Sequence, residues 1–149
     1  MKRTTILATT WTAFLLAVLT FIFVRPVSPD TIYEGDVCYK CRRAIDDARM
    51  AAETLDRQLP TKYRSPGCMV AYLAAHPDAD TRGFVTDYVS GRLIRAERAF
   101  YVSILVNDKT GERDYRAYYS PDAAREAARE TGADVITWQT LLERARARV

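Results

Sequence analysis

Hydrophobic residues in this chain first form one long uncharged run and then alternate with polar residues in short segments. The run extends from Thr4 to Val24 and follows Lys2 and Arg3. A helix needs about 20 apolar residues to cross a bilayer, and flanking positive charges stay on the cytoplasmic side. We therefore predict a single-pass anchor in the cell inner membrane over residues 1–24, with the domain facing the periplasm or cell exterior. A cleaved signal peptide is the alternative, but no A-x-A-like cleavage site follows the run.

Beyond the anchor, two prolines indicate a linker over residues 25–34, followed by one extracytoplasmic domain over residues 35–149. The first element predicted in this domain is a helix from about Lys40 to Arg57. Its apolar residues follow a spacing of four, three, four and three, which is typical of one helix face: Cys41, Ile45, Ala48, Ala52 and Leu55.

Ser-Pro pairs at Ser65-Pro66 and Ser120-Pro121 predict two further helix starts, and Thr137 is expected to cap a last helix. Alanines after Ser120 give the second of these helices a face of small residues, and Gly132 should end it. Aromatic and β-branched segments predict short strands at 62–64, 84–88, 93–94, 99–106, 115–119 and 134–136. Hairpins outnumber crossover connections, so the predicted fold class is α+β, with β-hairpins packed against short helices.

Composition adds few constraints. The chain is 48% hydrophobic and 28% charged with a net charge of +3, which indicates an ordinary folded domain. Basic residues do not cluster into a stripe, so no nucleic-acid partner is expected. We find no glycine-rich phosphate loop, no supported Ser-His-Asp set and no carboxylate pair with a reason to be catalytic, so no catalytic residues are predicted.

Three cysteines carry the candidate chemistry. Cys38 and Cys41 form a C-x-x-C, a spacing used for metal binding, dithiol exchange, structural disulfides and haem attachment. Arg42 excludes haem, which needs His at that position. Cys41 and Cys68 are both expected in the first turn of a helix, where the helix dipole stabilises thiolates. Two or three thiolates suit Cu(I) or Zn(II), so Cys38, Cys41 and Cys68 are the predicted metal ligands.

Thioether sulfur is the next soft donor. Met50 and Met69 are candidates for additional ligands, although Met in a small domain more often fills the core. His76, the single histidine, is expected to be an exposed residue at a helix end.

Two other functions use the same cysteines. The first is a dithiol–disulfide redox protein based on Cys38 and Cys41. The second is a metal-free binding or scaffold module in which these two residues form a structural disulfide, as is common in oxidising compartments.

Several segments together resemble proteins of the NosL family. They are Cys38 to Ile45, Asp47 to Glu53, Gly67 to Leu73, Val85 to Tyr88 with Ser90-Gly91, Ala96 through Ala99 to Tyr101-Val102, Ala123 to Ala128, Thr131 to Ala133 and Val135 to Trp138. The resemblance spans most of residues 35–145. NosL proteins are extracytoplasmic, usually lipid-anchored, Cu(I)-binding accessory proteins associated with nitrous oxide reductase. The resemblance implies a copper metallochaperone, not an enzyme. Its expected partners are a cuproenzyme such as nitrous oxide reductase or other copper-delivery machinery.

The chain departs from the family pattern at two soft-ligand positions. The family usually has C-x-x-C-x-M, and Arg43 occupies the Met position here. The family's Thr-Pro-Met-Gly loop is matched by Asp108 to Gly111, which contains neither Pro nor Met. Cys38, Cys41 and Cys68 are the remaining set of sulfur ligands.

Overall fold

The computed structural model describes residues 29–57, 59–77 and 81–148 of the chain. The predicted anchor, residues 1–24, lies outside these ranges, and within them no helix has the length and apolar character needed to cross a membrane. The predicted linker is described only from Pro29 onward. Within it, Ile32 is buried against Ile45 and Ala51, so the packed part of the chain begins before residue 35.

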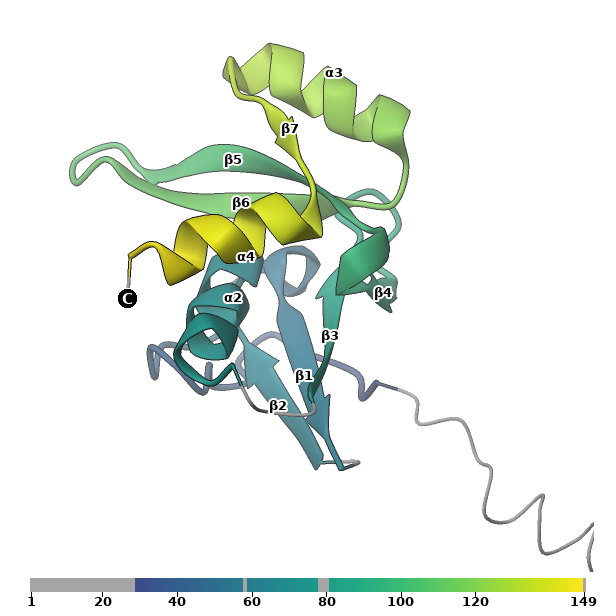
Figure 1. Ribbon diagram of the computed structural model, residues 1–149, viewed down its shortest axis with the longest axis vertical. Helices are drawn as coiled ribbons and strands as arrows, with labels where there is room; N and C mark the ends of the chain where they lie inside the picture. Colours follow the sequence, from purple (N-terminus) through teal and green to yellow (C-terminus); the bar gives the residue numbers. More distant parts are fainter. Residues whose placement is uncertain (1–28, 58, 78–80, 149) are drawn as a thin grey trace, which may run out of the picture.

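Four antiparallel strands form the first sheet, in the lower half of Figure 1, in the order β2-β1-β3-β4. Ala52 of β1 pairs with Tyr63 of β2 on one side and with Val85 of β3 on the other. Strand β2 is the first in this order and lies at an edge of the sheet. The strands predicted at 62–64, 84–88 and 93–94 are present as β2, β3 and β4. The bounds are β1 Ala52–Asp56, β2 Leu59–Tyr63, β3 Thr81–Thr86 and β4 Leu93–Arg95.

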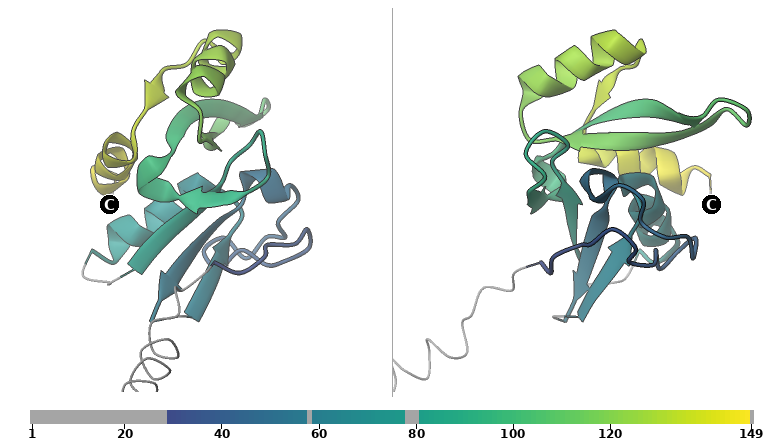
Figure 2. Two further views of the ribbon diagram at one scale, coloured as in Figure 1. Left: turned by 90° about the vertical axis from the view of Figure 1, so that its right-hand side faces the viewer. Right: turned by 180° about the vertical axis from the view of Figure 1, so that it is seen from behind.

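The second sheet has three antiparallel strands in the order β6-β5-β7, all of which were predicted. A parallel bridge between Asp87 and Ala117 connects it to the first sheet. The hairpin of β5 and β6 projects beyond the rest of the domain in Figure 2. The bounds are β5 Phe100–Asn107, β6 Glu112–Tyr118 and β7 Val135–Ile136.

The three α-helices begin where the capping residues predicted them. Ser65, Ser120 and Thr137 each accept a hydrogen bond from a backbone N–H of the first helical turn. This satisfies a donor that the helix itself leaves unpaired. Gly132 ends the second helix in the left-handed conformation, with a φ of 61°. The bounds are α2 Pro66–Ala75, α3 Pro121–Thr131 and α4 Trp138–Arg146, with short 3₁₀ turns η1 Ala48–Met50 and η2 Ala96–Arg98.

Helices cover both faces of the second sheet (Figure 1). Helix α3 lies on one face, and its small residues allow the close approach that the sequence predicted: Ala124, Ala127 and Ala128 pack with Val102 and Tyr118. Helix α4 lies on the other face, next to α2. The α+β fold class is thus confirmed.

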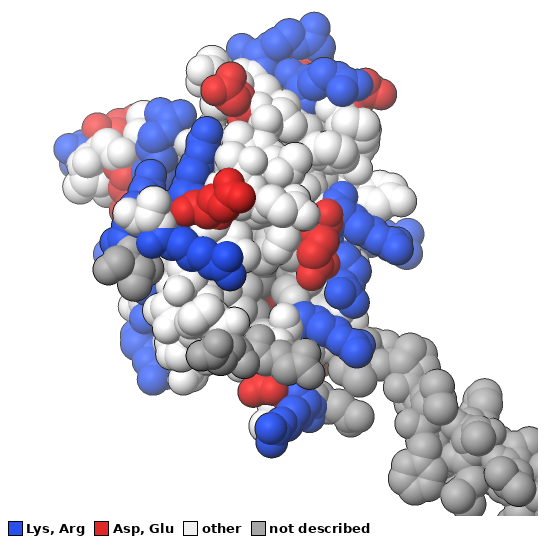
Figure 3. Space-filling model, viewed as in Figure 1, with Lys and Arg blue, Asp and Glu red and all other residues white. Residues whose placement is uncertain are grey.

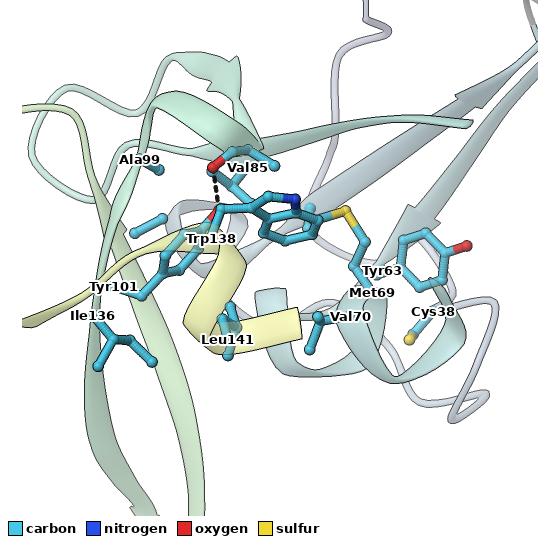
Figure 4. Packing of buried hydrophobic residues seen from close by; sticks show 13 residues of the cluster. Cys38, Tyr63, Met69, Val70, Val85, Ala99, Tyr101, Ile136, Trp138 and Leu141 are labelled. Atoms are coloured by element: carbon cyan, nitrogen blue, oxygen red, sulfur yellow. Dashed lines mark hydrogen bonds between the residues drawn. The ribbon is translucent and has the colours of Figure 1, made fainter. Parts of the chain in front are cut away.

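The main core fills the space between the two sheets and the pair α2 and α4 (Figure 4). Trp138 and Leu141 of α4 meet Met69 and Val70 of α2 there. Cys38 is also a fully buried member of this cluster. One of the candidate ligands is therefore fixed by the core itself.

The predicted helix from Lys40 to Arg57 is wrong. A hairpin occupies residues 36–45, and the chain then makes the η1 turn and enters β1. Arg42 has a positive φ of 61°, which no right-handed helix contains. Strand β1 is buried at four consecutive residues because it is central and covered on both faces. A strand in that environment loses the polar alternation that would identify it.

Asp87 connects the two sheets after β3. Its Oδ1 accepts a hydrogen bond from the backbone N–H of Tyr119 at 2.9 Å. Its Oδ2 accepts hydrogen bonds from the backbone N–H and the hydroxyl of Ser90. Burial alone would raise the pKa of Asp87, but these hydrogen bonds outweigh it and lower the pKa below the usual 3.8.

We expect Asp87→Asn to lower the free energy of unfolding by about 2 kcal/mol at pH 7, the range for hydrogen bonds to a charged acceptor. Stability from a carboxyl with a lowered folded pKa is present above its unfolded pKa and is lost as pH falls through the folded pKa. The difference from wild type should therefore shrink below about pH 4. Urea unfolding followed by circular dichroism measures both effects. Asp108→Asn, in the exposed β5–β6 loop, is the matched control. An equal loss of unfolding free energy in this variant would contradict the stabilising role of Asp87.

Candidate metal centre

The three cysteines predicted as ligands lie together in the structure. Their sulfur atoms are all within 4.8 Å of one another. Cys38 is buried, Cys68 is half-buried and Cys41 is exposed, and all three are free thiols. Two separate segments contribute them, because Cys38 and Cys41 lie in the hairpin of residues 36–45 and Cys68 lies in the first turn of α2. We call residues 36–45 the cysteine hairpin.

Local hydrogen bonds shape the cysteine hairpin. The backbone N–H of Cys38 donates to the carbonyl of Arg43 at 2.9 Å, and the N–H of Arg42 donates to the carbonyl of Cys38 at 3.0 Å. Val37 and Ala44 form an antiparallel bridge at its base. The C-x-x-C therefore turns around a tight loop, with both sulfurs on the side that faces α2. The expected helix start at Cys41 is wrong, whereas that at Cys68 is confirmed.

Strand β2 holds the cysteine hairpin in place. The backbone N–H of Tyr39 donates to the carbonyl of Lys62 at 2.9 Å, next to the C-x-x-C. The Lys62 ammonium lies 2.8 Å from a carboxylate oxygen of Asp36 and also donates to the carbonyl of Thr31. Their hydrogen bond raises the pKa of Lys62 and lowers the pKa of Asp36, so both remain charged at neutral pH.

Asp114 fixes the start of α2 from the second sheet. Its Oδ1 accepts a hydrogen bond from the backbone N–H of Gly67 at 3.1 Å. A Cβ on Gly67 would lie 2.5 Å from that same oxygen, so a larger residue there would displace the Asp114 carboxylate. The N–H of Cys68 donates instead to the hydroxyl of Ser65 at 3.1 Å. Helix α2 therefore presents Cys68 from a rigid first turn.

Cys38 has a lowered pKa although it is buried. Burial opposes its ionisation, but hydrogen bonding from the backbone of Cys41, Arg64 and Lys40, and from the Cys41 thiol, outweighs burial. Backbone donors around a sulfur stabilise the thiolate, the form that binds metal. The backbone N–H groups of the hairpin turn thus stabilise a thiolate at Cys38. The sequence analysis expected such stabilisation from a helix start at Cys41.

The pKa of Cys68 shifts in the opposite direction, upward. Burial raises its pKa to about 12, and the nearby Cys38, Cys41 and Asp114 also disfavour a second negative charge. The helix dipole and the Ser65 hydroxyl do not overcome these effects. The expectation that a helix start would favour the Cys68 thiolate is therefore wrong for the metal-free protein. A bound cation would reverse this balance.

Tyrosines form an aromatic wall beside the thiols, which the sequence analysis missed. Tyr39, Tyr63 and Tyr72 have ring centroids 5.5 to 6.4 Å apart. Tyr63 is fully buried and lies next to Cys38 in Figure 4. Burial, with a contribution from Cys38, raises the pKa of Tyr63, so this phenol stays neutral. The spacing of Tyr72 four residues after Cys68 on one helix was the available signal.

The two methionines have different surroundings. Met69 is fully buried in the core, and its sulfur lies beside Trp138 in Figure 4. Met50 lines a separate surface pocket between η1 and β5. His76 is exposed at the end of α2 and stacks on Tyr72 with a centroid distance of 4.2 Å. The core-filling interpretation fits Met69, and the helix-end interpretation of His76 is confirmed.

The two arginines that follow the C-x-x-C lie at the surface. Arg42 and Arg43 are both exposed. The Arg42 guanidinium lies over the ring of Tyr39, 5.5 Å from its centroid. This cation–π contact provides a partner for one of the two charges.

The sulfur arrangement fits a soft metal ion. Metal–thiolate bonds are about 2.3 Å long, so sulfurs around one trigonal ion lie about 4.0 Å apart, and those of a linear pair about 4.6 Å. The observed limit of 4.8 Å accommodates either geometry with small adjustments. In the described ranges no other His, Cys, Asp or Glu atom joins the group. A closed structural zinc site would need a fourth ligand.

Comparison with known proteins supports the fold. No protein-family model matches the chain, and no curated protein matches it in sequence. The structure is similar to the crystal structure of the copper chaperone NosL from Shewanella denitrificans, with a TM-score of 0.63 and 14% sequence identity. The match covers 77% of this chain and 96% of that chain. The chain therefore has a NosL-like fold.

We expect Cys41 to react with iodoacetamide at least ten times faster than Cys38 or Cys68 at pH 7.5, since reactivity requires both an accessible sulfur and its thiolate form. Cys38 is buried, and Cys68 remains a thiol far above neutral pH. Peptide mass spectrometry after timed alkylation measures the three rates, with urea-unfolded protein as the control in which they should converge. Equal rates in the folded chain would show that all three sulfurs are equally accessible, contrary to the burial of Cys38.

Proposed function

We propose that this protein binds one Cu(I) ion through Cys38, Cys41 and Cys68 and passes it to another protein. The convergence of three thiol sulfurs within 4.8 Å, from two segments far apart in the sequence, supports this proposal. The similarity of the fold to a copper chaperone supports it further.

The donor set favours Cu(I) over Zn(II). Cu(I) is soft and accepts two or three sulfur ligands, whereas the set lacks the fourth ligand of a structural zinc site. Cys38 is buried and Cys41 is exposed, so one side of the bound ion would face solvent. An ion with a low coordination number and an open side can accept a ligand from a partner before it loses its own. This property suits a chaperone.

The proposed place of action is the periplasmic face of the inner membrane. The uncharged run from Thr4 to Val24 after Lys2 and Arg3 supports a single-pass anchor. The proposed recipient is a cuproenzyme such as nitrous oxide reductase, or copper-delivery machinery that serves one. The resemblance to NosL proteins is the support for this recipient.

We expect the reduced full-length chain, kept in nonionic detergent, to bind about one equivalent of Cu(I). Cys38→Ser should weaken binding by at least a hundredfold, and Cys41→Ser and Cys68→Ser by at least tenfold, because each removes a soft ligand. Titration against a chromophoric Cu(I) chelator under anaerobic conditions measures the affinities. Met50→Leu and Met69→Leu are the matched sulfur-removing controls and should leave affinity unchanged.

Two results would contradict the proposal. The first is the absence of copper uptake by the reduced chain. The second is a Cys38–Cys41 disulfide that persists in excess glutathione, since structural bridges resist that reductant. Thermal unfolding with and without Cu(I) tests the alternative of a metal-free binding or scaffold module. Only a ligand that binds the native state raises the midpoint temperature of unfolding.

Copper binding should also release protons. Metal coordinates thiolates, and Cys68 carries its proton at neutral pH in the metal-free protein. The raised pKa of Cys68 means that the proton is lost only when the cation is bound, so the apparent affinity should increase from pH 6 to pH 8. A pH-indicator dye in weakly buffered solution measures the protons released. Cys68→Ser should release about one proton fewer.

A further inference from the structure

A groove begins at Cys68 and runs along the contact between α2 and α4. It has a volume of about 480 Å³. Its floor is apolar, with Val70 and Ala71 from α2 and Leu141 and Ala145 from α4. Cys68 is part of its wall, so any segment lying in the groove would have a residue next to the thiol cluster.

The rim of the groove is strongly cationic. Lys40, Arg113, Arg144 and Arg148 line it, from the cysteine hairpin, β6 and the end of α4. None of these four side chains takes part in the ion pairs found within the described part of the chain. In Figure 3, Lys and Arg side chains gather over the end of α4. Arg113 donates a hydrogen bond from Nε to the hydroxyl of Ser103. Among the described residues no carboxylate neutralises the four charges, so they can attract an anionic partner.

One carboxylate lines the groove, and it is already engaged. Asp114 accepts hydrogen bonds at Oδ1 from the backbone N–H groups of Gly67 and Tyr115, and burial raises its pKa. It therefore does little to neutralise the rim. A second surface hollow, over α3, differs in this respect, because its arginines form ion pairs with Asp122 and Glu126.

We propose that the groove docks an acidic, partly apolar segment of the protein that receives the copper ion. The inference rests on the proposed function and adds the chemistry of the partner to it. The four cations would attract glutamates or aspartates of the segment, and the apolar floor would accept small aliphatic side chains between them. Because Cys68 forms one end, a docked segment would hold its own metal ligand beside the bound ion.

Peptide binding tests the proposal. The probe is a short acetylated peptide in which Glu alternates with Leu, carrying an uncharged fluorophore, and its analogue has Gln in place of each Glu. We expect the full-length chain in nonionic detergent to bind the Glu peptide at least five times more tightly than the Gln peptide, measured by fluorescence anisotropy without metal. The preference should disappear near 1 M salt, where the screening length is about 3 Å.

Arg144→Gln with Arg148→Gln should weaken binding of the Glu peptide by roughly threefold to tenfold, the scale of two exposed ion pairs. Arg125→Gln with Arg129→Gln is the matched control, because it removes two exposed charges from helix α3. This control should bind the peptide like wild type, and circular dichroism should show both variants folded.

Four outcomes would overturn the docking proposal: no binding of the Glu peptide, equal binding of both peptides, equal losses in the two double variants, or a self-association of the chain that the peptide displaces. The last result would assign the groove to a second copy of the chain. Cu(I) titration of the same preparations is read separately. Copper uptake without peptide binding would refute only the docking surface. Peptide binding without copper uptake would refute the proposed function and the copper recipient as occupant, and would leave a groove that binds acidic segments.

Discussion

The contact between the cysteine hairpin and the edge of strand β2 determines where the candidate metal centre forms. One backbone hydrogen bond, from Tyr39 to Lys62, and the ion pair of Lys62 with Asp36 hold the hairpin against the sheet. Strand β2 leads directly into α2, so the same strand also sets the position of Cys68. Strand β2, together with Asp114 of the second sheet, thus sets the distance between the two thiol-bearing segments, and the three sulfurs lie together without a bound ion.

The three sulfurs differ in charge because their surroundings differ. Backbone donors of the hairpin turn favour the thiolate at Cys38, whereas burial keeps Cys68 protonated. Three adjacent thiolates would repel one another strongly in a partly buried site, and retaining the proton on Cys68 avoids that cost. A soft cation makes the fully ionised set favourable. In the metal-free protein the surroundings therefore favour the thiolate at Cys38 and the protonated thiol at Cys68.

Sequence reasoning succeeded where a feature depends on neighbouring residues. Ser65, Ser120 and Thr137 marked helix starts, and aromatic and β-branched residues marked β5, because caps and strand propensity act locally. It failed at β1, whose strand conformation depends on pairing with β2 and β3 and on cover from both faces. The three cysteines were grouped correctly, although the reason given for Cys41 was wrong. The tyrosine wall and the cationic groove combine residues from several elements, so the sequence offered only one partial signal, the spacing of Tyr72 from Cys68 on one helix.

The position of the cysteine hairpin has a consequence for solubility. An uncovered edge strand offers free N–H and C=O groups on which strands of other molecules can pair. Here the hairpin bonds to the outer edge of β2 at Lys62, and the charged side chain of Lys62 lies beside that contact. The segment that presents two of the thiols therefore also covers part of the β2 edge. Loss of the contact between Tyr39 and Lys62 would therefore uncover this edge and displace two of the three thiols together.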